Sequence, residues 1–132
     1  MITICVALEE ELPQAPEGDF QILYTGVGKV QAATTLCKHL CAFHKPDEIW
    51  NYGTAGALHP KVSGLNQIGA FVQRDMCAEP QAPRGSTPFT QPLLGDIQTP
   101  HGGIRCGTGD SFVMGPDPWF QEQNIDCVDM EG

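Results

Sequence analysis

Short apolar runs that each end in glycine or acidic residues are the feature that most constrains the fold. Residues 2–8 (ITICVAL) run into three glutamates, and residues 48–52 (EIWNY) run into the glycine-containing turn at 53–56. Such runs are typical of strands covered on both faces, as in parallel sheets. An amphipathic helical spacing lies between them. The alternation of strand, turn and helix therefore predicts an α/β fold.

The same reading assigns the other segments. We expect strands at residues 21–24, 68–74, 104–106 and 125–128, and an acidic, proline-containing loop at 9–19. The spacing predicts a helix over residues 29–44, ended by Pro46. Its apolar face would consist of Val30, Ala33, Leu36, Cys37, Leu40, Cys41 and Phe43. Residues 77–103 are rich in proline and glycine and predict a long surface excursion within a single domain spanning 1–132.

Charge and hydropathy exclude several classes of partner. The net charge of −9 argues against nucleic acid, whose binding requires clustered lysine and arginine, and against a polybasic membrane patch. No apolar run approaches the length of a membrane span. The amino terminus lacks the basic region and cleavage site of a signal peptide. We therefore expect a cytoplasmic protein that binds neither nucleic acid nor membrane.

The six cysteines allow two interpretations. An even number is compatible with three disulfides, but there is no C-x-x-C pair and no zinc-like spacing. Cys5, Cys106 and Cys127 lie in or beside apolar runs, and Cys37 and Cys41 are four residues apart on one helical face. These contexts favour reduced, mostly buried thiols. No histidine pair has ligand spacing either, so we expect no metal and no cofactor.

Every unusual cluster falls at the carboxyl end of a predicted strand, which is where α/β sheets bind ligands. These clusters are residues 9–11, 26–28, 53–56, 107–112 and 130–131. Taken singly, each also has a plain structural interpretation. Three adjacent carboxylates form a solvated turn, the glycine segments form ordinary tight turns, and Phe112 is either a core residue or a ring that stacks on a flat ligand.

In order along the chain, these segments resemble the nucleoside phosphorylase and nucleosidase superfamily, and most of all its methylthioadenosine/S-adenosylhomocysteine nucleosidase branch. The matching pieces are ALEEE (7–11), TGVGKV (25–30), NYGTAG (51–56), GTGDSFV (107–113) and VDME (128–131). The resemblance implies a phosphorylase-like three-layer fold. Its central sheet would be mixed, mostly parallel and twisted, flanked by helices and incomplete at the carboxyl end.

The resemblance also implies roles for individual residues. Glu11 matches the carboxylate that activates the attacking water, and Glu131 matches the residue that accepts hydrogen bonds from ribose hydroxyls. Phe112 matches the ring that stacks on the purine. The remaining substrate-binding positions that it implies are Met130 against the sugar, Val113 at the base edge, Thr54, Ala55 and Gly56 around base and ribose, and Leu8 and Val27 near the 5′ substituent.

These residue types suit cleavage of an N-glycosidic bond, which passes through an oxocarbenium-like sugar. Phosphorylases of the superfamily hold phosphate with arginines, but no arginine of this chain lies in the matching turns. We therefore expect a nucleosidase that uses water on an adenosine-type nucleoside. The alternatives are a phosphorylase or a non-catalytic nucleoside-binding remnant.

One expected element has no counterpart. The family supplies the aspartate that protonates the purine from a later strand, beyond the Met130–Glu131 position. We therefore expect these 132 residues to be a fragment of a longer protein, with an impaired remnant as the alternative. Because members of the family generally assemble as dimers or larger oligomers, we also expect a homo-oligomer.

Overall fold

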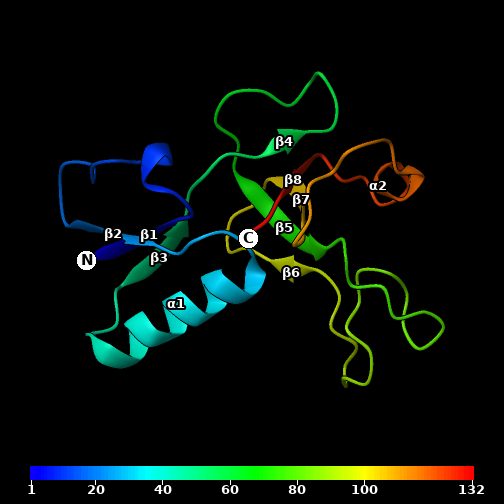
Figure 1. The fold of residues 1–132 in the computed structure, drawn as a ribbon, viewed down its shortest axis with the longest axis horizontal. Coiled ribbons are helices and arrows are strands. Elements are labelled where there is room, and N and C mark those ends of the chain that lie inside the picture. Colours follow the sequence, from blue (N-terminus) through cyan, green and yellow to red (C-terminus); the bar gives the residue numbers. More distant parts are fainter. The chain divides into compact units, whose positions relative to one another are not determined.

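The computed structural model describes residues 1–132, which divide into two compact units (Figure 1). The first unit contains residues 1–54 together with Glu131. The second contains residues 55–130 together with Gly132. Each unit has its own hydrogen-bonded sheet, and the two are described separately below.

The first unit is a three-stranded parallel sheet. The strands β1 (Ile2–Val6), β2 (Phe20–Tyr24) and β3 (Glu48–Asn51) lie in the order β2-β1-β3. In this register Ile4 faces Ile22 on one side and Trp50 on the other. Thr3, Ile4, Cys5 and Val6 of the central strand are buried, as the continuous apolar run predicts. A single 3₁₀ turn, η1 (Glu9–Glu11), follows β1.

Helix α1 (Lys29–Ala42) lies along one face of this sheet (Figure 1), but not with the predicted side inward. The half-buried positions are Ala32, Thr35, Leu36, His39 and Leu40. The Thr35 hydroxyl donates to the Thr25 carbonyl at 3.2 Å, and the His39 ring contacts the Gln21 amide at 3.1 Å. Because β2 satisfies these polar groups, they can face the sheet. Of the predicted apolar face, only Leu36 and Leu40 point inward, while Val30, Ala33, Cys37, Cys41 and Phe43 are exposed.

The second unit contains a five-stranded mixed sheet and a short helix. Its strands are β4 (Gly56–Ala57), β5 (Ile68–Gln73), β6 (Ile97–Gln98), β7 (Ile104–Thr108) and β8 (Cys127–Asp129). They lie in the order β4-β8-β7-β5-β6, with β5, β7 and β8 parallel and the two outer strands antiparallel. Helix α2 (Pro118–Glu122) begins after Asp117, whose side chain accepts from the Trp119 N–H. The predicted strands in β5, β7 and β8 are confirmed.

The core of the second unit forms where one side of this sheet meets α2. Val72, Phe120 and Ile125 are its buried members, with Leu58, Val113, Trp119 and Val128 packed around them. Cys106 and Cys127 are also buried and are register partners in β7 and β8. A hydrogen bond with Cys127, together with burial, raises the pKa of the Cys106 thiol and keeps it protonated.

All six cysteines are free, so the reduced interpretation agrees with the structure. The expectation that most would be buried is wrong. Cys37, Cys41 and Cys77 are exposed, the first two because α1 turns another face to the sheet.

The α/β fold class is confirmed, with strands that are mostly parallel. Residues 77–103 form the expected excursion, which contains only the two-residue strand β6. Neither α1 nor α2 has the length and hydropathy of a membrane-spanning helix.

Close backbone contact between the start of β5 and the approach to β7 predicts a stability difference between two neighbouring glycines. A Cβ on Gly103 would lie 2.1 Å from the Gln67 carbonyl oxygen, whereas a Cβ on Gly102 would meet nothing within 4 Å. We expect Gly103→Ala to lower the free energy of unfolding by about 1–3 kcal/mol, because the paired backbones must separate. Gly102→Ala should change it by no more than about 0.5 kcal/mol. Urea unfolding of both variants measures this, and equal effects would contradict the contact.

Candidate active site

The first unit brings Glu11 to the carboxyl end of its parallel sheet and holds the carboxylate there. Glu11 Oε1 accepts from the Thr54 N–H at 2.9 Å and from the Thr54 hydroxyl at 2.7 Å. Glu11 Oε2 accepts from the Leu8 N–H at 3.1 Å, which closes the η1 turn on itself. Three donors from two segments 43 residues apart therefore orient one carboxylate.

This environment keeps Glu11 ionised. Partial burial acts to raise the pKa of the Glu11 carboxyl, but hydrogen bonds from Thr54, Leu8 and Ala7 outweigh it and hold the pKa below its usual value. Gly53 allows the close approach, since a Cβ there would lie 3.3 Å from Glu11 Oε1. The result is a fixed anion that is ready to accept a proton at neutral pH.

A second carboxylate belongs to the same unit. Glu131 Oε1 accepts from the Gly28 N–H at 3.3 Å, at the amino end of α1. Gly28 has a φ of 97°, which favours glycine at this turn. The helix dipole favours an anion at this end of the helix. The turn after β2 thus binds a carboxylate from a residue 103 positions away.

The other predicted positions of the first unit lie beside these two. Leu8 and Val27 each have 47% of their surface exposed, at the ends of β1 and β2. Thr54 is exposed and bound to Glu11. Its role as the anchor of Glu11 was missed at the sequence level, because the contact depends on the parallel pairing of β1 with β3.

The second unit contains Ala55, Gly56, Phe112, Val113 and Met130. Phe112 is 80% exposed and follows the carboxyl end of β7, so its ring is not a core residue. Val113 packs against the core of the unit, and Met130 is half-buried directly after β8. Gly56 lies in β4, paired with Val128 of β8. Ala55 is exposed immediately before it.

Arg74 was not predicted to matter for this region. It follows β5 at the same edge of the second sheet, is 4% exposed, and donates to the segments that end in Phe112 and Met130. The available signal was an arginine placed directly after an apolar strand.

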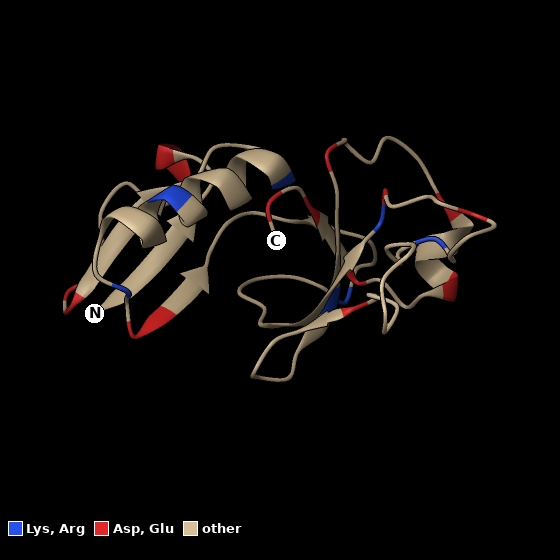
Figure 2. Cartoon of the chain, turned by 90° about the horizontal axis from the view of Figure 1, so that it is seen from below, with Lys and Arg blue, Asp and Glu red and all other residues tan.

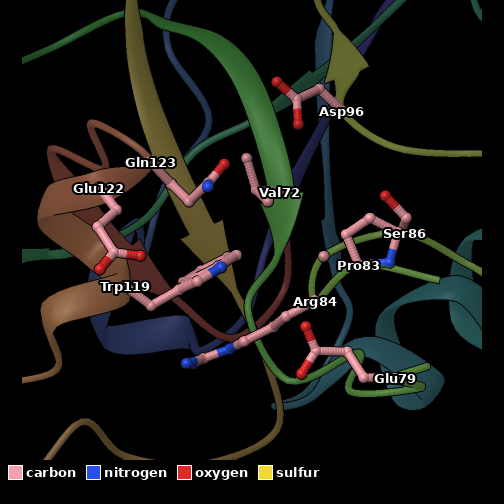
Figure 3. Close-up of a pocket in the computed structure, with 10 residues that line it drawn as sticks. Val72, Glu79, Pro83, Arg84, Ser86, Asp96, Trp119, Glu122 and Gln123 are labelled. Atoms are coloured by element: carbon pink, nitrogen blue, oxygen red, sulfur yellow. The ribbon is translucent and has the colours of Figure 1, made fainter.

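The structure also has a cavity of about 320 Å³ in the second unit that none of the predicted site residues lines. Figure 3 shows Arg84 beneath the Trp119 ring, with its guanidinium carbon 4.2 Å from the ring centre. Arg84 also pairs with Asp117 at 2.8 Å. Its other charged lining residues are Glu79, Asp96 and Glu122. The cavity is therefore distinct from the predicted site.

Acidic residues outnumber basic ones in both units (Figure 2). All three arginines lie in the second unit, and each is already paired there. Arg74 donates to backbone carbonyls, Arg84 pairs with Asp117, and Arg105 pairs with Asp96. No arginine side chain belongs to the segments around Glu11 and Glu131.

Comparison with known proteins gives one family and one fold. The model of the phosphorylase superfamily matches residues 16–132. None of the curated proteins compared matches the chain. Several solved structures do match, and three examples describe their range.

The Helicobacter pylori 5′-methylthioadenosine/S-adenosylhomocysteine nucleosidase is 20% identical with a TM-score of 0.78, covering 99% of this chain and 75% of that one. The H. pylori futalosine hydrolase is 21% identical with a TM-score of 0.77, covering 99% and 77%. The Streptococcus pyogenes S-adenosylhomocysteine nucleosidase is 24% identical with a TM-score of 0.68, covering 99% and 73%. At these identities the likeness shows the fold.

The hydrogen bonds to Glu11 predict how its titration responds to change at Thr54. Thr54→Val removes the hydroxyl donor, so the pKa of Glu11 should rise toward its ordinary value, whereas Thr54→Ser should leave it low. Because the folded-state pKa is lowered, the stabilisation that this carboxylate contributes is present above the ordinary pKa and is lost as pH falls through the folded one. Thr54→Val should therefore be destabilising at neutral pH and less so in acid. Carboxyl NMR titration, with Glu11→Gln to assign the signal, measures the shift; an unchanged pKa in Thr54→Val would contradict it.

Proposed function

Because the chain belongs to the phosphorylase superfamily, we propose that it is a purine nucleosidase that cleaves the N-glycosidic bond of an adenosine-type nucleoside with water. The observation that carries this proposal is the Glu11 carboxylate, fixed by Thr54 and Leu8 at the carboxyl edge of a parallel sheet. Ligands of α/β folds bind at such edges. The nucleosidases among the similar structures support the reaction class.

Glu11 acts as the general base in this proposal. Departure of the purine leaves an oxocarbenium-like sugar, and a water molecule adds to it as a carboxylate takes the water's proton. A base must be ionised before it can act, and the lowered pKa of Glu11 meets this need at neutral pH. Its fixed orientation reduces the cost of aligning the base with the water.

The sugar and the 5′ substituent are assigned to residues near the ends of β1, β2 and β8. Glu131 accepts hydrogen bonds from ribose hydroxyls, and Met130 packs against the ring. Leu8 and Val27, both substantially exposed, provide apolar surface for the 5′ substituent. The position of Glu131 at the amino end of α1 supports its assignment as a carboxylate that is charged when substrate arrives.

The base is assigned to the turn after β3 and the loop after β7. Phe112 stacks on the purine, backbone at Val113 contacts the base edge, and Thr54, Ala55 and Gly56 line the space around base and ribose. The exposure of the Phe112 ring supports this assignment, because a flat apolar surface is available for stacking.

Water is favoured over phosphate as the nucleophile by the charges at the Glu11 edge. Glu9, Glu10 and Glu11 would repel a phosphate dianion there. The arginines that could offset this repulsion are in the second unit and are engaged with carbonyls or carboxylates.

We predict that the protein releases free purine in phosphate-free buffer, because the nucleophile is water. Candidate substrates are 5′-methylthioadenosine, S-adenosylhomocysteine and futalosine, with chromatographic detection of base and sugar. Glu11→Gln should lower kcat by about 10²–10⁴-fold, the usual contribution of a general base. Glu10→Gln is the matched control, since Glu10 lies in the same turn and should leave the rate nearly unchanged.

Other outcomes separate the alternatives. Base release that requires added phosphate would identify a phosphorylase. Tight nucleoside binding without any product would identify a binding protein. Wild-type activity in Glu11→Gln would remove Glu11 as the base.

We also infer that the protein is a homo-oligomer, since the outward face of α1 exposes Val30, Cys37, Cys41 and Phe43. Analytical ultracentrifugation should give a mass of at least twice the 14.3 kDa of the chain. Sedimentation as a single 14.3 kDa species at micromolar concentration would contradict this inference.

The six free cysteines support a cytoplasmic location, where thiols are kept reduced.

A further inference from the structure

We propose that Arg74 is a positioning residue for nucleoside binding: its buried guanidinium holds the loop of residues 107–113, which carries Phe112, against the end of β8, which carries Met130. This inference rests on the function proposed above. It concerns the second unit alone, where all the relevant contacts lie.

The position of Arg74 is unusual for a charged side chain. It follows β5 at the edge where β7 and β8 also end, and only 4% of its surface is exposed. Burying a guanidinium is costly unless its N–H groups are paired. No carboxylate accepts from it among the hydrogen bonds that hold it, so backbone carbonyls must provide the compensation.

Those carbonyls come from the two segments that the proposal concerns. The Arg74 Nε donates to the Gly107 carbonyl at 3.1 Å, and Nη2 donates to the Gly109 carbonyl at 3.3 Å and to the Asp129 carbonyl at 3.1 Å. Ser111 accepts twice, through its hydroxyl from Nη1 at 3.2 Å and through its carbonyl from Nη2. One side chain thereby joins residues directly before Phe112 to the residue directly before Met130.

The loop is shaped to receive this group. A Cβ on Gly109 would lie 3.0 Å from Arg74 Cζ and 3.0 Å from Asp75 Cγ, so only glycine lets the backbone lie this close. Asp75 adds a further bond, since its carboxylate accepts from the Asp110 N–H at 2.8 Å. The Gly109 N–H donates to the Asp129 carbonyl at 3.2 Å, which joins the loop to β8 directly.

The planar fork of arginine is what this arrangement requires. Its five N–H donors are fixed in one plane, whereas lysine has three donors on a single nitrogen and cannot reach four residues at once. Phe112 makes little contact of its own, being 80% exposed, so its position depends on the backbone before it. Loosening that backbone should weaken binding of the base more than it slows the chemical step.

The test is Arg74→Lys, with Arg105→Lys as the matched control. Arg105 is in the same sheet and also donates to a backbone carbonyl, that of Gln123, but it lies near the amino end of β7. We expect Arg74→Lys to raise KM for the cleaved nucleoside by about tenfold or more and to change kcat by less than about threefold. A merely structural defect would lower the active fraction, and thus kcat, without moving KM.

Hydrogen exchange provides a readout that needs no substrate. Amides of residues 108–113 should exchange faster in Arg74→Lys than in the wild type or Arg105→Lys. If Arg74→Lys does not fold, Gly109→Ala displaces the guanidinium from the opposite side, with Gly115→Ala, whose Cβ meets nothing within 4 Å, as control. The same rise in KM and in loop exchange is expected.

The outcomes separate this inference from the proposed function. If the wild-type protein neither binds nor cleaves any nucleoside, the proposed function fails, and the nucleoside-positioning role of Arg74 fails with it even where exchange reveals the clamp. If the wild type is active and Arg74→Lys keeps both wild-type KM and wild-type loop exchange, the positioning role is overturned while the function stands. Faster exchange with unchanged KM would also overturn it.

Discussion

Parallel pairing of β1 with both β2 and β3 is the constraint on which the candidate site of the first unit depends. Parallel strands end at the same edge, so the turns that follow them meet there whatever their separation in sequence. This is why Thr54, after β3, can donate two hydrogen bonds to Glu11, after β1. An antiparallel β3 would place its carboxyl end at the opposite edge and leave the Glu11 carboxylate without these donors.

The second unit meets the same requirement with the opposite charge. Its parallel strands β5, β7 and β8 end together, and the polar group at their edge is the buried guanidinium of Arg74. In the first unit backbone and hydroxyl donors surround a carboxylate, and in the second backbone carbonyls surround a cation. In both cases a charged group is stabilised by neutral dipoles of loops, which in turn become ordered around it.

Prediction from sequence succeeded where a signal was local and long enough. The apolar run of β1, the strands β5 and β7, and the extent of α1 follow from periodicity over several residues. The two-residue strands β4 and β6 carry no periodicity and were not predicted. Helix α2 was also missed, although Asp117 followed by Pro118 is a recognisable helix start. The orientation of α1 was predicted wrongly because hydrophobicity alone does not show that Gln21 and Thr25 would satisfy His39 and Thr35.

The sequence by itself determined the α/β class, the order of the elements and the placement of the glycine and glutamate clusters at strand ends, because these depend on residues close together in the chain. Only the tertiary structure decided which donors each charged group receives. Glu11 is held by a threonine 43 residues away, and Arg74 joins a loop to a strand end 55 residues away. Such bonds depend on which strands are neighbours in a sheet, and hydrogen-bond pairing between distant segments leaves no periodic trace in the sequence.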